Sequence, residues 1–237
     1  MLELRGISKT LGNKRVLCDL DLKVCPKEIV YVLGRSGVGK SVLLKTIVGL
    51  IVQDSGEVFV EGVRTEPGNE DQMALVRKKC GLVFQTPTLL DSLNVLENLL
   101  FAFEEENRST LSEVLEWVNL SPEVLELLPD QLSYGAQKKI SFLRTLLLRP
   151  KYLLFDEPTT GLDPISSEST NRLIKKGAEL SGAGVIVVSH DVKSAIKLAN
   201  RIQVMDEGRF VFSGTPGEFE KSEVALVKAF RENTVFL

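Results

Sequence analysis

Residues 34–41 form a glycine-rich stretch whose residue types suit the binding of a polyphosphate. In order they are Gly34, Arg35, Ser36, Gly37, Val38, Gly39, Lys40 and Ser41. A glycine, four free positions and Gly-Lys-Ser form the pattern of a phosphate-binding loop, in which glycines let backbone N–H groups approach the phosphates. Lys40 can offset charge on the β and γ oxygens, and the Ser41 hydroxyl can ligate Mg²⁺. The stretch therefore predicts a nucleotide-phosphate site.

The residues on either side of this loop predict the two elements that would position it. Residues 29–33 are an apolar run typical of a buried parallel strand, and residues 42–50, which begin with Val42, have the apolar spacing of a helix. That helix would direct the positive end of its dipole at the phosphates. A chance glycine turn before a helix is the alternative.

Two carboxylates follow a second apolar strand, residues 152–155. Asp156 and Glu157 would lie at the carboxyl edge of that strand, where open α/β sheets bind ligands. Asp156 is placed to hold Mg²⁺ through water, and Glu157 to accept a proton from an attacking water. The alternative is a solvated turn after a strand. The phosphate-binding loop favours the catalytic interpretation.

Two other polar side chains stand where predicted strands end. His190, the single histidine, follows a strand that ends near Val188, and it could bind the γ-phosphate or orient water. Gln85 follows a strand over residues 80–84 and could contact the metal or the water. Neither residue is decisive by itself, because a lone histidine is more commonly a packed or surface residue.

A predicted helix that begins near Ser133 leaves two interpretations open. Ser133 is a natural N-cap for a helix over residues 136–148. Lys138 and Lys139 lie in the first turn, which is the unfavourable end of the helix dipole for cations. The helix either presents a solvated basic face or offers a second anion-binding end to a phosphate of another site.

Composition excludes several classes of protein. The 237 residues carry a formal net charge of -3, so nothing indicates wholesale nucleic-acid binding. The three cysteines lack metal-ligand spacing and are expected to be reduced, as in a cytosolic protein. No apolar run approaches the roughly 18 to 20 residues of a membrane span, and residues 1–5 do not resemble a secretory leader. A membrane role would therefore require a partner.

The order of the predicted elements indicates an α/β chain. Strands over residues 2–4 and 16–24 alternate polar and apolar residues, which predicts an antiparallel β portion with Leu11 in the turn before the second strand. From residue 87 to 148 helical patterns replace strand patterns. Helices are expected there over residues 95–100, 111–118, 124–128 and 136–148.

After residue 148 the strand patterns resume. The strand that leads to Asp156 and a strand over residues 184–188 flank a helix over residues 165–180, which predicts a right-handed βαβ crossover. A last amphipathic helix is expected over residues 218–230. The strands on both sides of the helical segment therefore predict one doubly wound core with a helical insert.

Taken together, these motifs resemble the ATP-binding-cassette ATPases over almost the whole chain. The matching residues are the loop 34–41, Gln85, residues 132–139, Asp156, Glu157, Gly161, Leu162, Asp163 and His190. The resemblance implies a single domain, residues 1–237, with a P-loop NTPase (RecA-like) core over 1–86 and 149–237. A helical subdomain over 87–148 would carry the signature motif. ATP and Mg²⁺ would be its cofactors, with Ser41, Gln85 and Asp156 at the metal.

In that family two cassettes enclose two ATP molecules, so the resemblance implies a homodimer. Ser133 and Gly135 would contact the γ-phosphate held by the partner, and Asp163 would lie at the dimer contact. Gln85 would link the site to the helical insert. The groove beside Gln85 would receive a coupling helix of an integral membrane permease subunit, which implies a cytoplasmic location on the inner face of the membrane.

The chain departs from the family pattern at three positions. Tyr134 and Ala136 replace the first glycine and the glutamine of the usual Leu-Ser-Gly-Gly-Gln signature. Leu11 stands where the family usually has an aromatic residue that stacks on adenine, and it offers only an apolar contact. The hydrolysis rate, the closed dimer and the selectivity for the base depend on these differences.

Several stretches resemble a narrower group, the MlaF-like ATPases of lipid-transport systems that use MCE proteins. They are residues 37–45, 76–85, 161–165 and 189–195. Val42, where most cassettes have threonine, is the most distinctive of these residues. This resemblance implies phospholipid as cargo, with an MCE-type lipid-binding protein and a small cytosolic regulator as partners. The alternatives are the ATPase of a small-solute importer and a weakly hydrolysing ATP-gated clamp.

Overall fold

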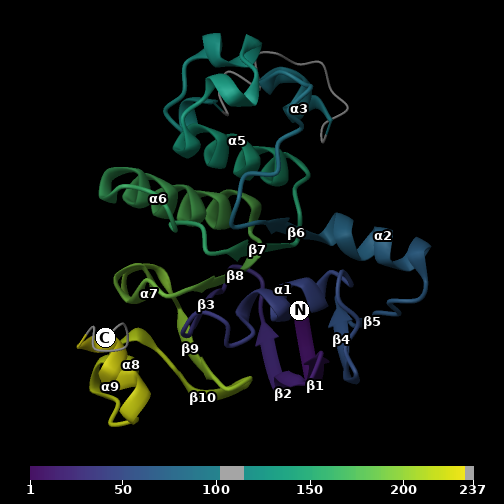
Figure 1. Ribbon diagram of the computed structural model, residues 1–237, viewed down its shortest axis with the longest axis vertical. Helices are drawn as coiled ribbons and strands as arrows, with labels where there is room; N and C mark the ends of the chain where they lie inside the picture. Colours follow the sequence, from purple (N-terminus) through teal and green to yellow (C-terminus); the bar gives the residue numbers. More distant parts are fainter. Residues whose placement is uncertain (102–114, 233–237) are drawn as a thin grey trace.

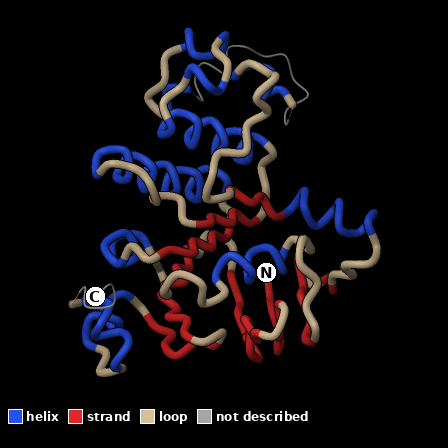
Figure 2. The backbone as a smooth tube through the Cα atoms, in the orientation of Figure 1, coloured by secondary structure: helices blue, strands red, loops and turns tan. Residues whose placement is uncertain are grey.

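The computed structural model of the chain describes residues 1–101 and 115–232, which are built around two β-sheets (Figures 1 and 2). The antiparallel sheet has the order β2-β1-β4-β5, with β1 (Leu2–Leu11), β2 (Lys14–Val24), β4 (Ser55–Val60) and β5 (Val63–Arg64). The second sheet has the order β10-β9-β3-β8-β7-β6, with β3 (Ile29–Leu33), β6 (Cys80–Val83), β7 (Tyr152–Asp156), β8 (Gly184–Ser189), β9 (Arg201–Asp206) and β10 (Arg209–Gly214). Its strands from β9 to β6 are parallel, and β10 pairs antiparallel at the edge.

The central strands of the second sheet are buried on both faces, as their continuous apolar runs predict. Every residue of β3, β7 and β8 is buried. Along β3, Tyr31 and Leu33 pack into one hydrophobic core, whereas Val30 and Val32 pack into another. Because successive side chains of a strand point to opposite faces, one sheet separates two cores and needs cover on each side.

The first core lies between the two sheets and contains helix α1 (Lys40–Ile47). Leu43 and Leu44 of this helix are fully buried among residues of both sheets. Helix α2 (Glu70–Lys79) contributes Met73 to the same core. Since α1 begins immediately after the glycine-rich loop, this packing fixes the position of the loop against β3.

The second core lies on the other face of the parallel sheet and is covered by helices (Figure 1). Their bounds are α5 (Tyr134–Leu147), α6 (Pro164–Ser181), α7 (Val192–Leu198), α8 (Pro216–Lys221) and α9 (Ala225–Arg231). Helix α6 connects β7 to β8, and the two strands are parallel neighbours. The predicted βαβ unit and the predicted α/β fold with an antiparallel portion are therefore confirmed.

Between β6 and β7 the described elements are helical, and they lie together at the top of Figure 1. They are α3 (Val95–Leu100), the 3₁₀ helices η1 (Pro122–Glu126) and η2 (Pro129–Gln131), and α5. The fully buried Asn98 joins them, because its amide donates to the carbonyls of Leu90, Leu93 and Asn94 and its oxygen accepts from Arg144 of α5. The boundaries at residues 87 and 148 stay a prediction.

Three expectations about local structure are wrong. The helix expected over 124–128 is the short 3₁₀ helix η1, which begins at Pro122. The single helix expected over 218–230 is divided into α8 and α9, because the Ser222 hydroxyl accepts a hydrogen bond from the Val224 N–H and so competes with the helical pattern. Leu11 is the last residue of β1 rather than a turn residue.

Of the helix expected over 111–118, residues 111–114 lie outside the described residues. The three cysteines are free thiols, and Cys18 and Cys80 are buried. Within residues 1–101 and 115–232, none of the helices combines the length and the apolar content that crossing a membrane requires.

Candidate functional site

The glycine-rich loop joins β3 to α1 and closes around the side chain of Lys40. The Lys40 ammonium is buried and donates to the backbone carbonyls of Gly34 at 2.7 Å and Arg35 at 3.0 Å. Gly37 and Gly39 have φ values of 77° and 111°. Residues with a Cβ rarely adopt these values, so the two glycines allow the loop to turn with its N–H groups toward a ligand.

Gly39 has a second constraint that Gly37 lacks. A Cβ at Gly39 would lie 2.3 Å from the Val16 carbonyl oxygen, whereas a Cβ at Gly37 would meet nothing within 4 Å. Both alanine variants carry left-handed strain of about 1 to 2 kcal/mol. We expect Gly39→Ala to lose more stability than Gly37→Ala, because only it must displace β2 backbone. Chemical unfolding of the nucleotide-free variants measures the difference, and equal losses would contradict this account of the loop.

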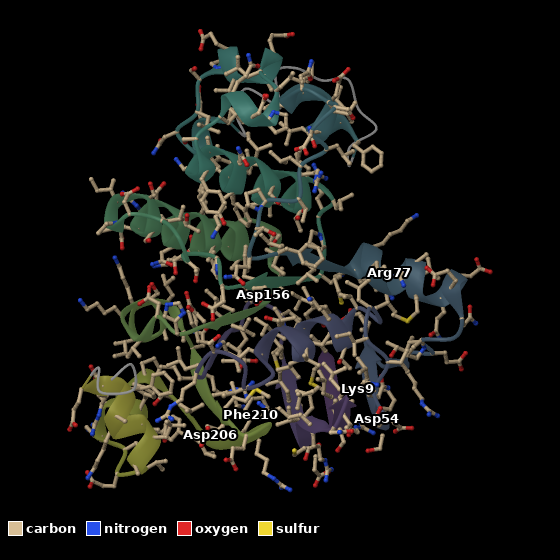
Figure 3. The ribbon with its side chains drawn as sticks, in the orientation of Figure 1. Lys9, Asp54, Arg77, Asp156, Asp206 and Phe210 are labelled. Carbon is tan, nitrogen blue, oxygen red and sulfur yellow. The ribbon has the colours of Figure 1, made fainter. Side chains whose placement is uncertain are left out.

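Asp156 and Ser41 meet below the loop although they are far apart in the sequence. Asp156 is the last residue of β7 and lies near the middle of the molecule (Figure 3). The Ser41 hydroxyl donates to its Oδ1 at 2.8 Å. Burial raises the pKa of Asp156 above its usual range; the bond from Ser41 opposes this shift, and the nearby charge of Glu157 adds to it. The Ser41 hydroxyl and the Asp156 carboxylate therefore place two hard oxygen donors, of the kind that bind metal ions, next to each other.

Glu157 follows Asp156 and points its carboxylate between Lys40 and His190. Its Oε1 lies 3.2 Å from the Lys40 ammonium, and its Oε2 lies 2.8 Å from Nδ1 of His190. The Thr160 hydroxyl also donates to Oε2, at 3.1 Å. Burial alone would raise the pKa of Glu157, but the His190 contact and the Lys40 charge outweigh it and leave that pKa below its usual value.

His190 provides a direct probe of this carboxylate, because it is the single histidine of the chain. The bond to Glu157 raises the pKa of His190, burial and the charge of Lys40 oppose the shift, and Asp191 adds to it. We expect NMR titration to give His190 a pKa above about 6.5, and Glu157→Gln to lower it. Protonation of His190 therefore stabilises the fold below the unfolded pKa of histidine, and this contribution is lost as pH rises through the folded pKa of His190. An unchanged pKa in Glu157→Gln would contradict the contact.

The loop and these polar side chains line one cavity of about 560 Å³. Ten of its residues are among those predicted from the sequence, namely Leu11, Ser36, Gly37, Gly39, Lys40, Ser41, Val42, Gln85, Glu157 and His190. Val16 and Thr160 line it too, and the sequence analysis missed both. Val16 belongs to an ordinary alternating strand, whereas Thr160 stands three residues beyond Glu157, a proximity that could have drawn attention to it.

Other predicted residues lie outside the cavity lining. Gly34, Arg35, Val38 and Asp156 belong to the loop and to the layer beneath it. Ser133 caps α5 and Asp163 caps α6, and each side chain accepts hydrogen bonds from its own helix. Gly135 packs near Leu162, so the start of α5 and the loop before α6 are neighbours. Within one chain, Ser133, Gly135 and Asp163 are not part of the cavity lining.

Lys138 resolves part of the open question about the α5 helix. It is buried, and its ammonium donates to the carbonyls of Pro158 and Thr160, so a solvated basic face is wrong for this residue. Lys139 is partly buried and donates to the Val118 carbonyl. Both lysines therefore make structural contacts within the chain rather than presenting free charge.

Comparison with known proteins decides the family. The ABC transporter family model matches residues 17–160, which is more than half of the chain. The chain belongs to the ABC transporter family. It is 35% identical to the glutamine transport ATP-binding protein GlnQ of Escherichia coli (strain K12), over 91% of this chain and 92% of that protein. It is 32% identical to the protein TRIGALACTOSYLDIACYLGLYCEROL 3, chloroplastic, of Arabidopsis thaliana, over 97% of this chain and 73% of that protein.

A solved structure agrees with this assignment to the ABC family. The ATP-binding cassette MJ0796, in a dimeric structure of a post-hydrolysis state bound to ADP and Pi, superposes with a TM-score of 0.82. It shares 30% identity, over 91% of this chain and 99% of that chain. As an ABC ATP-binding subunit, the chain binds ATP and is an ATPase coupled to transport. The predictions of an ABC ATPase and of its P-loop NTPase fold are confirmed.

Proposed function

We propose that this ABC ATPase hydrolyses ATP in the cavity between its glycine-rich loop and Glu157 and thereby powers phospholipid transport through a separate permease. The observation that carries the hydrolytic part is the position of Glu157. Its carboxylate is held between Lys40, at the base of the loop, and His190, in the same cavity that the loop lines. A carboxylate with a lowered pKa is ionised at neutral pH and can accept a proton from water.

Each side chain around the cavity has a role in this proposal. When ATP binds, the Lys40 ammonium leaves the loop carbonyls and Glu157 and contacts the β and γ oxygens of ATP. The Glu157 carboxylate is then free to orient the attacking water. His190 holds Glu157 and contacts the γ-phosphate, and Gln85, which lines the same cavity, orients the water. The exposed Leu11 provides an apolar contact for the base. Backbone N–H groups of the loop stabilise the charge that develops on the transferred phosphoryl group.

The residues around Ser41 suit Mg²⁺. Mg²⁺ favours hard oxygen donors and is commonly bound by one or two carboxylates together with substrate phosphates. The Ser41 hydroxyl and the buried Asp156 carboxylate meet these preferences, and their hydrogen bond shows that they already face each other. Gln85, which lines the same cavity, adds an amide oxygen. When bound, Mg²⁺ supplies positive charge that offsets the charge of the phosphate oxygens.

The active assembly is proposed to be a homodimer of cassettes. The described form of MJ0796 is dimeric and holds ADP and Pi. In an equivalent dimer of this chain, Ser133 and Gly135 would face the γ-phosphate bound by the partner, and Asp163 would lie at the contact. This arrangement would explain why these three residues lie outside the cavity of their own chain. The helical subdomain, residues 87–148, is proposed to carry Ser133 and Gly135 of this surface.

A second surface is proposed to receive the permease. A groove of about 540 Å³ lies between the segment that follows α1, β6 and the helical elements. Its lining includes four exposed apolar residues, Leu50, Leu90, Phe101 and Leu148, together with Arg77 and Arg144. Exposed apolar area with a polar rim is typical of a protein interface. Docking there would place the ATPase on the cytoplasmic face of the membrane as a peripheral subunit.

Two observations favour different cargoes. Phospholipid is favoured by the resemblance to MlaF-like ATPases, which includes Val42. The Arabidopsis relative, whose name contains that of a galactolipid, matches 97% of this chain and favours a lipid cargo in general. On this reading an MCE-type protein and a small cytosolic regulator are partners. Small-solute import is the second candidate, since GlnQ is named for glutamine transport and GltL of Escherichia coli (strain K12), 37% identical over 89% of each chain, for glutamate and aspartate import.

Purification of the chain from its native membrane with its bound subunits tests the proposal. We expect a permease and an MCE protein to co-purify, and we expect Mg²⁺-dependent ATP hydrolysis that transfers labelled phospholipid between vesicles. A permease with a solute-binding protein, and hydrolysis stimulated by an amino acid, would favour the importer instead. Absence of both a membrane partner and turnover would favour the ATP-gated clamp.

A further inference from the structure

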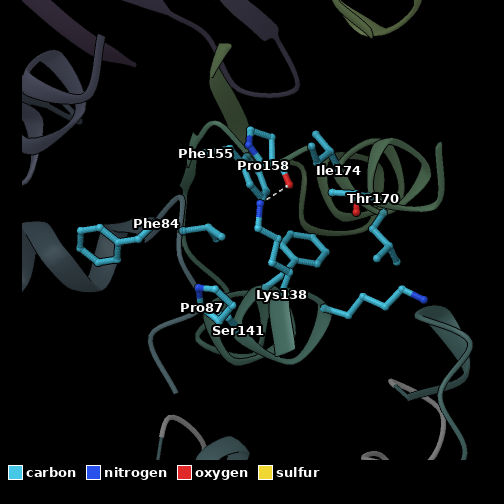
Figure 4. A pocket seen from close by; sticks show the side chains of 12 residues that line it. Phe84, Pro87, Lys138, Ser141, Phe155, Pro158, Thr170 and Ile174 are labelled. Atoms are coloured by element: carbon cyan, nitrogen blue, oxygen red, sulfur yellow. Dashed lines mark hydrogen bonds between the residues drawn. The ribbon is translucent and has the colours of Figure 1, made fainter. Parts of the chain in front are cut away.

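The N-terminal part of α5 contacts the loop that carries Glu157 through one buried lysine, Lys138. Lys138 is 7% exposed, and its ammonium donates to the backbone carbonyl of Pro158 at 3.1 Å, the bond drawn in Figure 4. The same ammonium donates to the carbonyl of Thr160 at 2.7 Å. These carbonyls belong to the residues that directly follow Glu157. Helix α5 therefore holds the loop that follows β7 by two hydrogen bonds from the single ammonium of Lys138.

The burial of Lys138 is itself informative. Removing an ammonium from water is costly unless it is well hydrogen-bonded, and charged donors make the stronger hydrogen bonds. Burial lowers the pKa of Lys138, whereas the charge of Glu157 raises it. Lys138 also lies over the ring of Tyr134, with its nitrogen 5.2 Å from the ring centroid. The Tyr134 hydroxyl in turn donates to the Gln85 carbonyl at 3.3 Å, so the same helical turn contacts a second loop of the nucleotide site.

Thr160 completes the path from Lys138 to Glu157. Its carbonyl accepts from Lys138, its hydroxyl donates to Glu157 Oε2 at 3.1 Å, and its N–H donates to the Glu157 carbonyl at 3.2 Å. Glu157 has a φ of 48°, in the left-handed region that non-glycine residues rarely adopt. Such a conformation persists where surrounding contacts hold it, and the contacts here include the bonds to Lys138.

We propose that Lys138 is a positioning residue for ATP hydrolysis, which holds the Pro158–Thr160 loop so that the Glu157 carboxylate stays beside His190 in the cavity. This inference rests on the proposed role of Glu157 as the base. Ser133 and Gly135, which are proposed to face the nucleotide of the partner, occupy the same end of α5 as Lys138. Lys138 therefore connects that surface to Glu157, the carboxylate that acts on the nucleotide bound by its own chain. A movement of α5 on dimer closure would then be transmitted to Glu157.

Lys138→Met tests this role, with Lys139→Met as the matched control. Methionine keeps an unbranched side chain only one atom shorter and removes the hydrogen bonds of the ammonium. Lys139 is its neighbour on the same helix but binds the Val118 carbonyl, away from the cavity. In the complex with its membrane subunits, we expect Lys138→Met to lower kcat about 10- to 100-fold, with the KM for ATP within about twofold, because misplacing a catalytic group costs rate rather than affinity. Lys139→Met should keep the original kcat.

A second readout needs neither ATP nor turnover. In the nucleotide-free protein, loss of the Lys138 bonds should move Glu157 away from His190 and lower the pKa of His190 measured by NMR, as in Glu157→Gln. Lys139→Met should leave it unchanged. Thr160→Val, which keeps Lys138 and its buried surroundings, should lower the same pKa. Combining it with Lys138→Met should lower the pKa no further, because both changes interrupt one path.

The outcomes separate this inference from the proposed function. If Glu157→Gln abolishes hydrolysis but Lys138→Met keeps the original kcat and the original His190 pKa, the positioning role is wrong and the base assignment stands. If Lys138→Met and Lys139→Met lower kcat equally, the effect belongs to the helix in general and the inference is overturned. If Glu157→Gln hydrolyses ATP normally, the proposed base is wrong, and the His190 readout still reports whether Lys138 holds the loop.

Discussion

Replacing Glu157 with glutamine is expected to lower the rate of ATP hydrolysis by about 100- to 10,000-fold, the usual contribution of a general base. Glutamine keeps the size and the hydrogen-bonding oxygen of the side chain but cannot take a proton from water. The glycine loop and Lys40 are unchanged, so ATP should still bind and should remain bound unhydrolysed. Single-turnover hydrolysis and the stoichiometry of retained ATP in the purified complex measure both effects.

Two results would decide the interpretation of that variant. Rapid turnover by purified Glu157→Gln would remove the base assignment. Loss of ATP binding together with hydrolysis would indicate that Glu157 supports the fold of the site rather than the chemistry. Glu168→Gln is a suitable control, because Glu168 pairs with Lys197 on exposed surface and lies outside the cavity lining.

Replacing Lys40 with alanine is expected to abolish productive ATP binding. The buried ammonium closes the glycine loop through two carbonyls and faces Glu157 at 3.2 Å. Without it, the β and γ oxygens lose their cation and the Glu157 carboxylate is left buried beside them with less compensating charge. Like charges would then repel within the cavity. Direct titration with ATP, in the presence and absence of Mg²⁺, measures the loss of affinity.

Lys197→Ala provides the control for Lys40→Ala. Lys197 lies on α7, where its exposed ammonium pairs with Glu168. Because exposed ion pairs are worth about 0 to 1 kcal/mol, its loss should change neither ATP affinity nor stability appreciably. ATP affinity in Lys40→Ala equal to that of the unmodified protein would show that the backbone of the loop suffices for binding. That result would remove the proposed role of the lysine.

The sequence by itself determined the core of the site, since its chemistry is local or lies at strand ends. The spacing within residues 34–41 specifies the loop directly. Asp156 and His190 follow apolar runs that only a buried parallel strand accommodates, and the carboxyl ends of parallel strands meet at one edge of a sheet. Patterns of this kind assigned distant residues to one nucleotide site without any knowledge of the tertiary structure.

Only the tertiary structure decided the features that depend on long-range packing. The sequence left Lys138 open between a solvated basic face and an anion-binding helix end, because no local pattern records that the loop after β7 places two carbonyls against its ammonium. Val16 reads as an ordinary strand residue, and its place in the cavity follows from how β2 packs against the glycine loop. The break between α8 and α9 depends on a serine that competes for a backbone N–H. A sequence pattern reports the preference of a segment, whereas burial and hydrogen-bond partners are set by the elements that pack against it.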